Sequence, residues 1–88
     1  MTPGNVVIPI AGREKGRLHI VLDIDNEFAL IADGKRRRVE KPKRKKIKHM
    51  EVAEGYFSEN AKTNKEIRRV LAIIKNEIEE GEPCQKKI

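Results

Sequence analysis

Apolar and polar positions alternate along residues 5–25, and a short basic segment interrupts them once. After that segment, aliphatic residues lie two apart at Leu18, Ile20, Leu22 and Ile24. Successive side chains of a strand point to opposite faces, so this pattern predicts a half-buried strand over 18–24. Residues 6–10 have the same period and predict a preceding strand. There Pro9, which has no N–H, fits only at a sheet edge or facing away from its partner strand.

Shorter patterns predict further strands up to residue 50. Residues 28–32 are apolar nearly throughout, and we expect Phe28 and Leu30 to face inward. Asp33-Gly34 is typical of a two-residue hairpin turn, which needs φ > 0 at both positions. A fourth strand over 35–39, ended by Pro42, and a fifth over 46–50 then follow. Four to five short strands separated by turns predict a mainly β fold, a small barrel over residues 1–50.

The period of the pattern changes after residue 62. Thr63 and Glu66 form a capping box, which marks the start of a helix. Aliphatic residues then fall on one helical face at Ile67, Val70, Leu71, Ile74 and Ile78. With Gly81 as a stop, these signals predict a connector over 51–62, an amphipathic helix over 63–81 and a flexible tail over 82–88. We expect the helix to pack on the barrel of a monomer; docking on a partner or homodimerisation is the alternative.

Charge is distributed unevenly along the chain. Charged residues make up 39% of it and the net charge is +6. Residues 1–50 contain 13 Lys and Arg against 6 acidic residues, whereas residues 51–88 contain 7 against 8. A basic half beside a nearly neutral half indicates a localised surface for a polyanion. Because aromatic residues are only 3% of the chain, we expect contacts to phosphates and shape rather than base stacking on aromatic side chains.

Two segments supply the candidate binding residues. The predicted hairpin loop combines glycine with cations at Gly12, Arg13, Lys15, Gly16 and Arg17. Glycine lets other backbone approach closely and exposes N–H groups, so phosphate is a natural ligand for this loop. A denser basic segment follows at Lys35, Arg36, Arg37, Arg38, Lys41, Lys43, Arg44, Lys45, Lys46 and Lys48. Taken alone, the loop could equally be a solvated turn, and a solvated strand and linker is the alternative for the basic segment; the adjacency of the two favours a site for RNA phosphates.

Residues 4–25 together resemble a KOW motif. The likeness rests on Gly4, the run Val6-Val7-Ile8, the loop over 12–16 and the alternating strand after it, and it extends more loosely to residue 50. This chain departs from many KOW motifs in having no glycine over 17–20. KOW motifs occur in ribosomal proteins and in NusG-type transcription factors, within a small SH3-like β-barrel that contacts RNA or protein.

The resemblance implies a function as well as a fold. It implies a non-enzymatic RNA-binding protein that is associated with the ribosome, with ribosomal RNA as its partner and ribosomal proteins as possible further partners. The alternative is a KOW-type protein–protein interaction module of the transcription or translation machinery. Fold does not settle function, so both interpretations stay open at this point.

The sequence has no pattern typical of catalysis or of a cofactor site. His19, His49 and Cys84 lack the spacing of metal ligands, and we expect His19 to be an exposed strand residue. Ser58 has no candidate base nearby, and no phosphate-binding or dinucleotide-binding glycine motif occurs. We therefore expect no enzymatic activity, no metal, no cofactor and no small-molecule substrate.

Features of membrane and secreted proteins are also absent from the sequence. It contains no apolar run of about 18 residues and no N-terminal signal pattern. The basic segment has no amphipathic apolar face beside it, which argues against membrane binding. A single cysteine cannot form an internal disulfide. We expect a cytoplasmic location.

Overall fold

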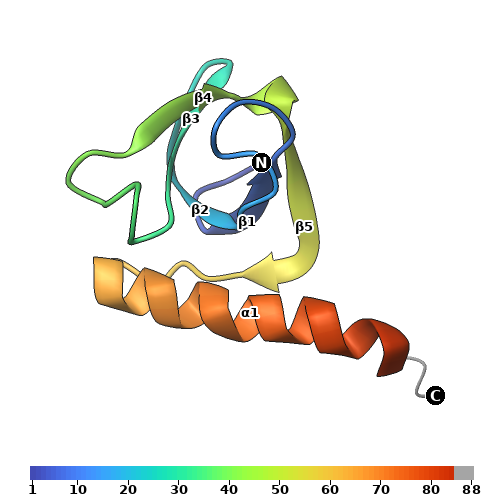
Figure 1. Cartoon of the computed structure of the whole chain (residues 1–88). Helices are drawn as coiled ribbons and strands as arrows, with labels where there is room; N and C mark the ends of the chain where they lie inside the picture. Colours follow the sequence, from blue (N-terminus) through green and yellow to red (C-terminus); the bar gives the residue numbers. More distant parts are fainter. Residues whose placement is uncertain (85–88) are drawn as a thin grey trace.

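The computed structural model describes residues 1–84 and, for side chains, residues 1–78. Its elements are β1 (Asn5–Pro9), β2 (His19–Asp25), β3 (Phe28–Ala32), β4 (Lys43–Lys46), the 3-10 helix η1 (Ile47–His49), β5 (Met50–Phe57) and α1 (Asn64–Cys84). The strands form one antiparallel sheet in the order β4-β3-β2-β1-β5. Helix α1 lies along one side of the strands (Figure 1). The predicted mainly β fold with a C-terminal helix is confirmed.

The predicted hairpin is formed by β1 and β2, which pair with Val6 opposite Ile20. Strand β1 lies between β2 and β5, so it is not an edge strand. The carbonyl of Pro9 accepts the N–H of Gly16 at 2.9 Å, and the next residue, Ile10, donates its N–H to the carbonyl of His49 on the opposite side. Because successive residues of a strand direct their polar groups to opposite neighbours, Pro9 faces the hairpin loop and leaves the pairing with β5 intact.

Both faces of the sheet are buried. One cluster joins sheet and helix: Val6, Ile20, Ala32, Ala61, Ile67, Leu71 and Ile74. The other lies on the opposite face: Val7, Val21, Ala29, Ile31 and Met50. Neighbours along one strand, such as Val6 and Val7, thus enter different clusters, as the two-residue period requires. The strand predicted to be half-buried over 18–24 is buried on both faces over 19–21, since Val21 packs with Ala29, Ile31 and Met50 in the second cluster.

Strand β3 has the orientation opposite to the one expected. Ala29 and Ile31 are fully buried, whereas Phe28 and Leu30 are half-buried. An apolar run has no polar positions to fix its face, so the pairing of Ile31 with Val21 decides which side is buried. On the outer side the guanidinium of Arg44 lies 3.7 Å from the centroid of the Phe28 ring, a cation–π contact.

The strands predicted over 35–39 and 46–50 are wrong. Residues 33–42 form a loop, and the cationic residues 43–46 form β4, with Ile31 opposite Lys43. Long lysine stems can cover apolar surface while their charges stay in water, so a strand of four cations is stable beside β3. Strand β5 then occupies most of the segment expected to be a connector over 51–62. Gly34 has φ +80°, but Asp33 does not have a positive φ, so the turn is not a two-residue hairpin.

Helix α1 begins as predicted. The N–H of Glu66 donates to Thr63 Oγ1 at 3.1 Å, and Glu66 Oε1 accepts the N–H of Thr63 at 3.2 Å, which confirms the capping box. The helix continues through Gly81 to Cys84, beyond the predicted end. Glycine costs only about 1 kcal/mol in a helix and ends one only where the chain turns left-handed. Of the predicted tail, residues 82–84 are thus helical and 85–88 lie outside the described residues.

Within the described residues, no helix has both the length and the hydropathy needed to cross a bilayer.

Candidate nucleic-acid interface

The loop between β1 and β2 is a compact turn that directs its cations outward. Gly12 and Gly16 have φ of +86° and +79°, the left-handed conformation that glycine adopts without strain. The N–H of Lys15 donates to the carbonyl of Gly12 at 3.2 Å, and that of Arg17 to the carbonyl of Glu14 at 3.1 Å. Arg13, Lys15 and Arg17 are exposed, as predicted. The acid among them, Glu14, is turned inward and is 6% exposed.

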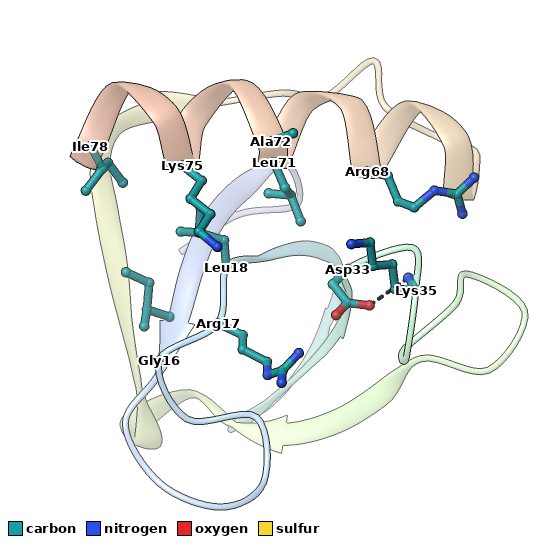
Figure 2. A pocket seen from close by; sticks show the side chains of 11 residues that line it. Gly16, Arg17, Leu18, Asp33, Lys35, Arg68, Leu71, Ala72, Lys75 and Ile78 are labelled. Atoms are coloured by element: carbon teal, nitrogen blue, oxygen red, sulfur yellow. Dashed lines mark hydrogen bonds between the residues drawn. The ribbon is translucent and has the colours of Figure 1, made fainter. Parts of the chain in front are cut away.

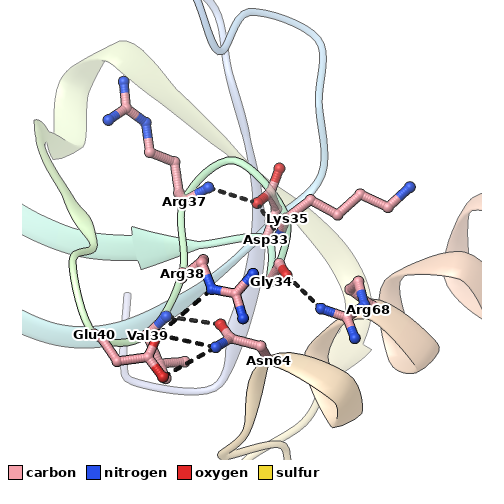
Figure 3. Close-up of polar contacts among 9 residues, drawn as sticks. All are labelled: Asp33, Gly34, Lys35, Arg37, Arg38, Val39, Glu40, Asn64 and Arg68. Carbon is pink, nitrogen blue, oxygen red and sulfur yellow. Dashed lines mark hydrogen bonds and ion pairs between the residues drawn. The ribbon is translucent and has the colours of Figure 1, made fainter.

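The loop between β3 and β4 is closed on itself by Asp33. Its Oδ1 accepts the N–H groups of Lys35 and Arg37, both at 2.9 Å (Figure 3). The N–H groups of Asp33 and Gly34 donate to the carbonyl of Arg37 at 2.9 and 3.1 Å. Burial raises the pKa of Asp33, but the hydrogen bonds from the backbone lower it more, so the net shift of this pKa is downward. An ionised Asp33 thus fixes the start of the basic segment and presents Arg36 to solvent.

The same loop is attached to the first two turns of α1. Asn64 Oδ1 accepts the N–H of Val39 at 2.8 Å, and Asn64 Nδ2 donates to the carboxylate of Glu40 at 3.0 Å. Arg68 Nη1 donates to the carbonyl of Gly34 at 2.7 Å (Figure 3). A Cβ on Gly34 would lie 2.5 Å from the carbonyl oxygen of Asn64, so only glycine allows this close approach. The segment expected to be a strand and linker is therefore an ordered loop held against the helix.

An ion pair connects the two loops. Arg37 Nε donates to Glu14 Oε2 at 2.9 Å, and Arg37 Nη2 contacts the same oxygen. Burial raises the pKa of Glu14, but the hydrogen bond and the charge of Arg37 lower it more, and the net shift is downward. Arg37, which we expected to contact RNA, thus has an acidic partner within the protein. It is half-buried, whereas its neighbour Arg36 is exposed.

Arginine side chains from both loops surround a small cavity, which we call the arginine pocket. Its volume is about 140 Å³, and it is lined by Arg13, Glu14, Arg17, His19, Asp33, Arg36 and Arg37. Among the described side chains, Arg13, Arg17 and Arg36 have no acidic partner within 4.0 Å. Both acids of the pocket are already hydrogen-bonded to the protein, so the pocket keeps an excess of positive charge that an anion can neutralise.

His19 lies beneath this pocket and is 1% exposed, so the prediction of an exposed strand residue is wrong. It lies on the same sheet face as Val21, which belongs to the second buried cluster. His19 Nδ1 is 2.8 Å from the carbonyl of Arg17, which requires a proton on Nδ1, and Nε2 has no partner among the described residues. Burial lowers the pKa of His19, so the ring is neutral at pH 7.

Strand β4 carries four more of the predicted cations, and one of them, Lys45, reaches the β1–β2 loop. The register places Lys43 and Lys45 on the face of Ile31 and Ala29, and Arg44 and Lys46 on the opposite face. Lys45 Nζ lies 3.0 Å from the position of a Cβ on Gly12, so β4 reaches the β1–β2 loop. On the other face Arg44 is 3.5 Å from Asp25 and stacks over Phe28.

The remaining predicted residues lie apart from the arginine pocket. Lys48 is exposed in η1, and Lys41 is exposed near the end of the β3–β4 loop. Arg38 is 3.7 Å from Glu40, and both side chains are largely exposed. The structure therefore brings Arg13, Arg17 and Arg36 together and places Lys41 and Lys48 outside the pocket.

A second cavity, which we call the helix groove, was not predicted. It has a volume of about 540 Å³ between α1 and the β1–β2 and β3–β4 loops. Aliphatic side chains line it at Ile8, Leu18, Leu71, Ala72 and Ile78. Charged side chains line it at Arg17, Asp33, Lys35, Arg68 and Lys75 (Figure 2). The sequence signal that could have indicated this groove is the position of Arg68 and Lys75, which directly follow Ile67 and Ile74 of the buried helix face and therefore lie at its border.

Comparison with known proteins does not assign the chain to a family. Neither the protein-family models nor the curated proteins compared with the chain give a match. Among the residues that the structure describes, no group of three or more His, Cys, Asp or Glu side chains could hold a metal ion.

Proposed function

We propose that this chain is a non-enzymatic RNA-binding protein whose β1–β2 and β3–β4 loops contact the phosphates of structured RNA. The observation that supports the proposal is the arginine pocket, where Arg13, Arg17 and Arg36 of two separate loops converge without acidic partners among the described side chains. Guanidinium groups are planar, permanently charged and matched to phosphate oxygens. Binding releases counterions from the RNA, so the affinity falls as salt rises.

We further propose that the strands form an SH3-like barrel of KOW type. Support comes from the buried clusters on both faces of a five-stranded antiparallel sheet, because an open sheet covered by one helix would have a solvated second face. The glycine-rich loop of the KOW resemblance, with positive φ at Gly12 and Gly16, is also consistent with this assignment. By the same resemblance, we propose ribosomal RNA as the partner and the cytoplasmic ribosome as the place of action.

Sucrose-gradient sedimentation of host lysate tests this proposal. We expect co-migration with the large ribosomal subunit at low salt and release at high salt, since phosphate contacts are screened. RNase treatment should move the protein to the light fractions. Complexes that survive RNase would instead identify a protein-interaction module, and absence from ribosomal fractions at both salt concentrations would exclude the ribosome as the partner.

A further inference from the structure

The helix groove and the arginine pocket are neighbours, because Arg17 and Asp33 line both cavities. The pocket offers guanidinium groups, whereas the groove combines an apolar floor with separate cations. A ligand that occupies both the arginine pocket and the helix groove therefore needs negative charge for the guanidinium groups and a flat or apolar part for the floor of the groove. A nucleic-acid strand with an unstacked base has both.

We infer that the helix groove holds one unpaired nucleotide of the bound RNA, with its base on the apolar floor and its flanking phosphates on the cations at the rim. This inference rests on the proposed function, since it names the part of the RNA that the protein recognises. Bases removed from a stack are commonly held against aromatic or apolar side chains. The floor under the base would be Leu18 and Leu71, which belong to the segment before β2 and to α1.

The groove has the size and charge that this occupant requires. Its volume of about 540 Å³ falls within the range of about 300–1,000 Å³ found for small-ligand sites. Arg17, Lys35 and Lys75 approach from three different segments (Figure 2), and among the described side chains none of the three has an acidic partner within 4.0 Å. The single acid, Asp33, already accepts two backbone N–H groups. Charge complementarity thus favours an anionic occupant.

Helix α1 therefore has two functions under this inference. Ile67, Leu71 and Ile74 complete the core against the sheet, while Leu71 also faces the groove together with Ala72 and Lys75. Arg68 links the two functions, since it binds the carbonyl of Gly34 at 2.7 Å and also lines the groove. The contact holds the β3–β4 loop, with Lys35, at the edge of the groove.

Fluorescence anisotropy with three RNA hairpins tests the inference. The three hairpins share one stem. The first is fully paired, the second carries one bulged nucleotide, and the third carries an abasic residue at the position of the bulge. We expect the bulged RNA to bind about tenfold more tightly than the other two, near the lower end of what stacking one base on an aromatic side chain contributes, because the floor here is aliphatic. Equal and salt-sensitive binding of all three would overturn the inference but keep the proposed function; no binding of any of them at low salt would overturn both.

Variants of α1 locate the effect. Ala72→Leu fills the groove at an exposed helical position without changing charge, and Asn76→Leu adds a leucine at an exposed position that does not line the groove. We expect Ala72→Leu to abolish the preference for the bulge and Asn76→Leu to keep it, with both variants folded by circular dichroism. The opposite pattern would contradict the inference. Amide shifts around the groove produced by an acidic, leucine-rich peptide, but not by the bulged RNA, would assign the groove to a protein partner instead.

Discussion

Arg37 and Glu14 join two loops that are 23 residues apart in the chain, through a hydrogen bond of 2.9 Å from Arg37 Nε to Glu14 Oε2. The Glu14 side chain is 8% exposed and the Arg37 side chain 32% exposed. Removing either partner leaves the other charge partly buried and unpaired, which is more costly than losing an exposed ion pair. This pair joins the two loops whose other arginines line the pocket.

We therefore expect Arg37→Ala to lower the free energy of unfolding by about 2 kcal/mol, the typical value of a hydrogen bond to a charged group. Arg38→Ala is the matched control, because Arg38 pairs with Glu40 at 3.7 Å and both side chains are exposed. Its effect should stay below about 0.5 kcal/mol. Urea denaturation measures both values, and equal losses would contradict an internal role for Arg37.

Arg36 should behave in the opposite way to its neighbour. It lines the arginine pocket, is exposed and has no acidic partner among the described side chains. We expect Arg36→Ala to leave the unfolding midpoint unchanged and to reduce the slope of log affinity against log salt by about 1, the effect of one lost phosphate contact. An unchanged slope for a structured RNA would remove Arg36 from the interface.

Two glycines with similar backbone conformations should differ in their response to alanine. Gly16 and Gly34 have φ of +79° and +80°, and a side chain at either is strained by about 1–2 kcal/mol. A Cβ at Gly16 meets nothing within 4 Å, whereas a Cβ at Gly34 would lie 2.5 Å from the Asn64 carbonyl oxygen and 2.9 Å from Arg68 Cγ. Gly34→Ala should therefore destabilise the protein more than Gly16→Ala in thermal denaturation. A larger loss for Gly16→Ala would contradict the packing of the loop on α1.

Acidification should destabilise the protein through His19. Burial lowers the pKa of His19 below the ordinary value of about 6.5 that it has in the unfolded chain. The unfolded state then binds the proton more readily, so the stabilising effect is complete above pH 6.5 and is lost as the pH falls toward the folded-state pKa. The slope is at most about 1.4 kcal/mol per pH unit for one proton.

An NMR titration of the imidazole signals of His19 in the folded protein measures this pKa directly. We expect a midpoint below 6.5, accompanied by a fall in the unfolding temperature between pH 6.5 and 5. A midpoint at or above 6.5 would show that the ring is solvated or paired with an acid, contrary to its burial beneath the arginine pocket.

Local signals in the sequence were sufficient for the hairpin and the helix start. The strand expected over 18–24 and the Thr63–Glu66 capping box depend on neighbours in the chain, and both are found in the structure. The segment over 33–50 could not be predicted in this way. Its course depends on distant contacts, namely Arg37 with Glu14 and Asn64 with Val39 and Glu40, and no local pattern specifies them.

In the candidate site, too, some features follow from the local sequence and others depend on distant contacts. Composition and charge runs indicated the β1–β2 loop and the basic segment, but they could not distinguish Arg36, which faces the arginine pocket without an acidic partner, from Arg37, which is paired internally. The helix groove depends on how α1 packs against the sheet, which places Lys75, Arg17 and Leu18 around one cavity (Figure 2). Tertiary packing therefore decides which cations are available to a ligand.

The affinity for a structured RNA measured over a range of salt concentrations tests the central claim most directly. The key variant replaces Arg13, Arg17 and Arg36 with alanine, and its control replaces Lys62, Lys65 and Arg69, three exposed cations that line neither the arginine pocket nor the helix groove. Both variants lose three positive charges. The pocket variant should lower the magnitude of the salt slope by about 3 and the control by less than 1. Equal reductions in the two variants would mean that net charge, and not the arginine pocket, governs binding.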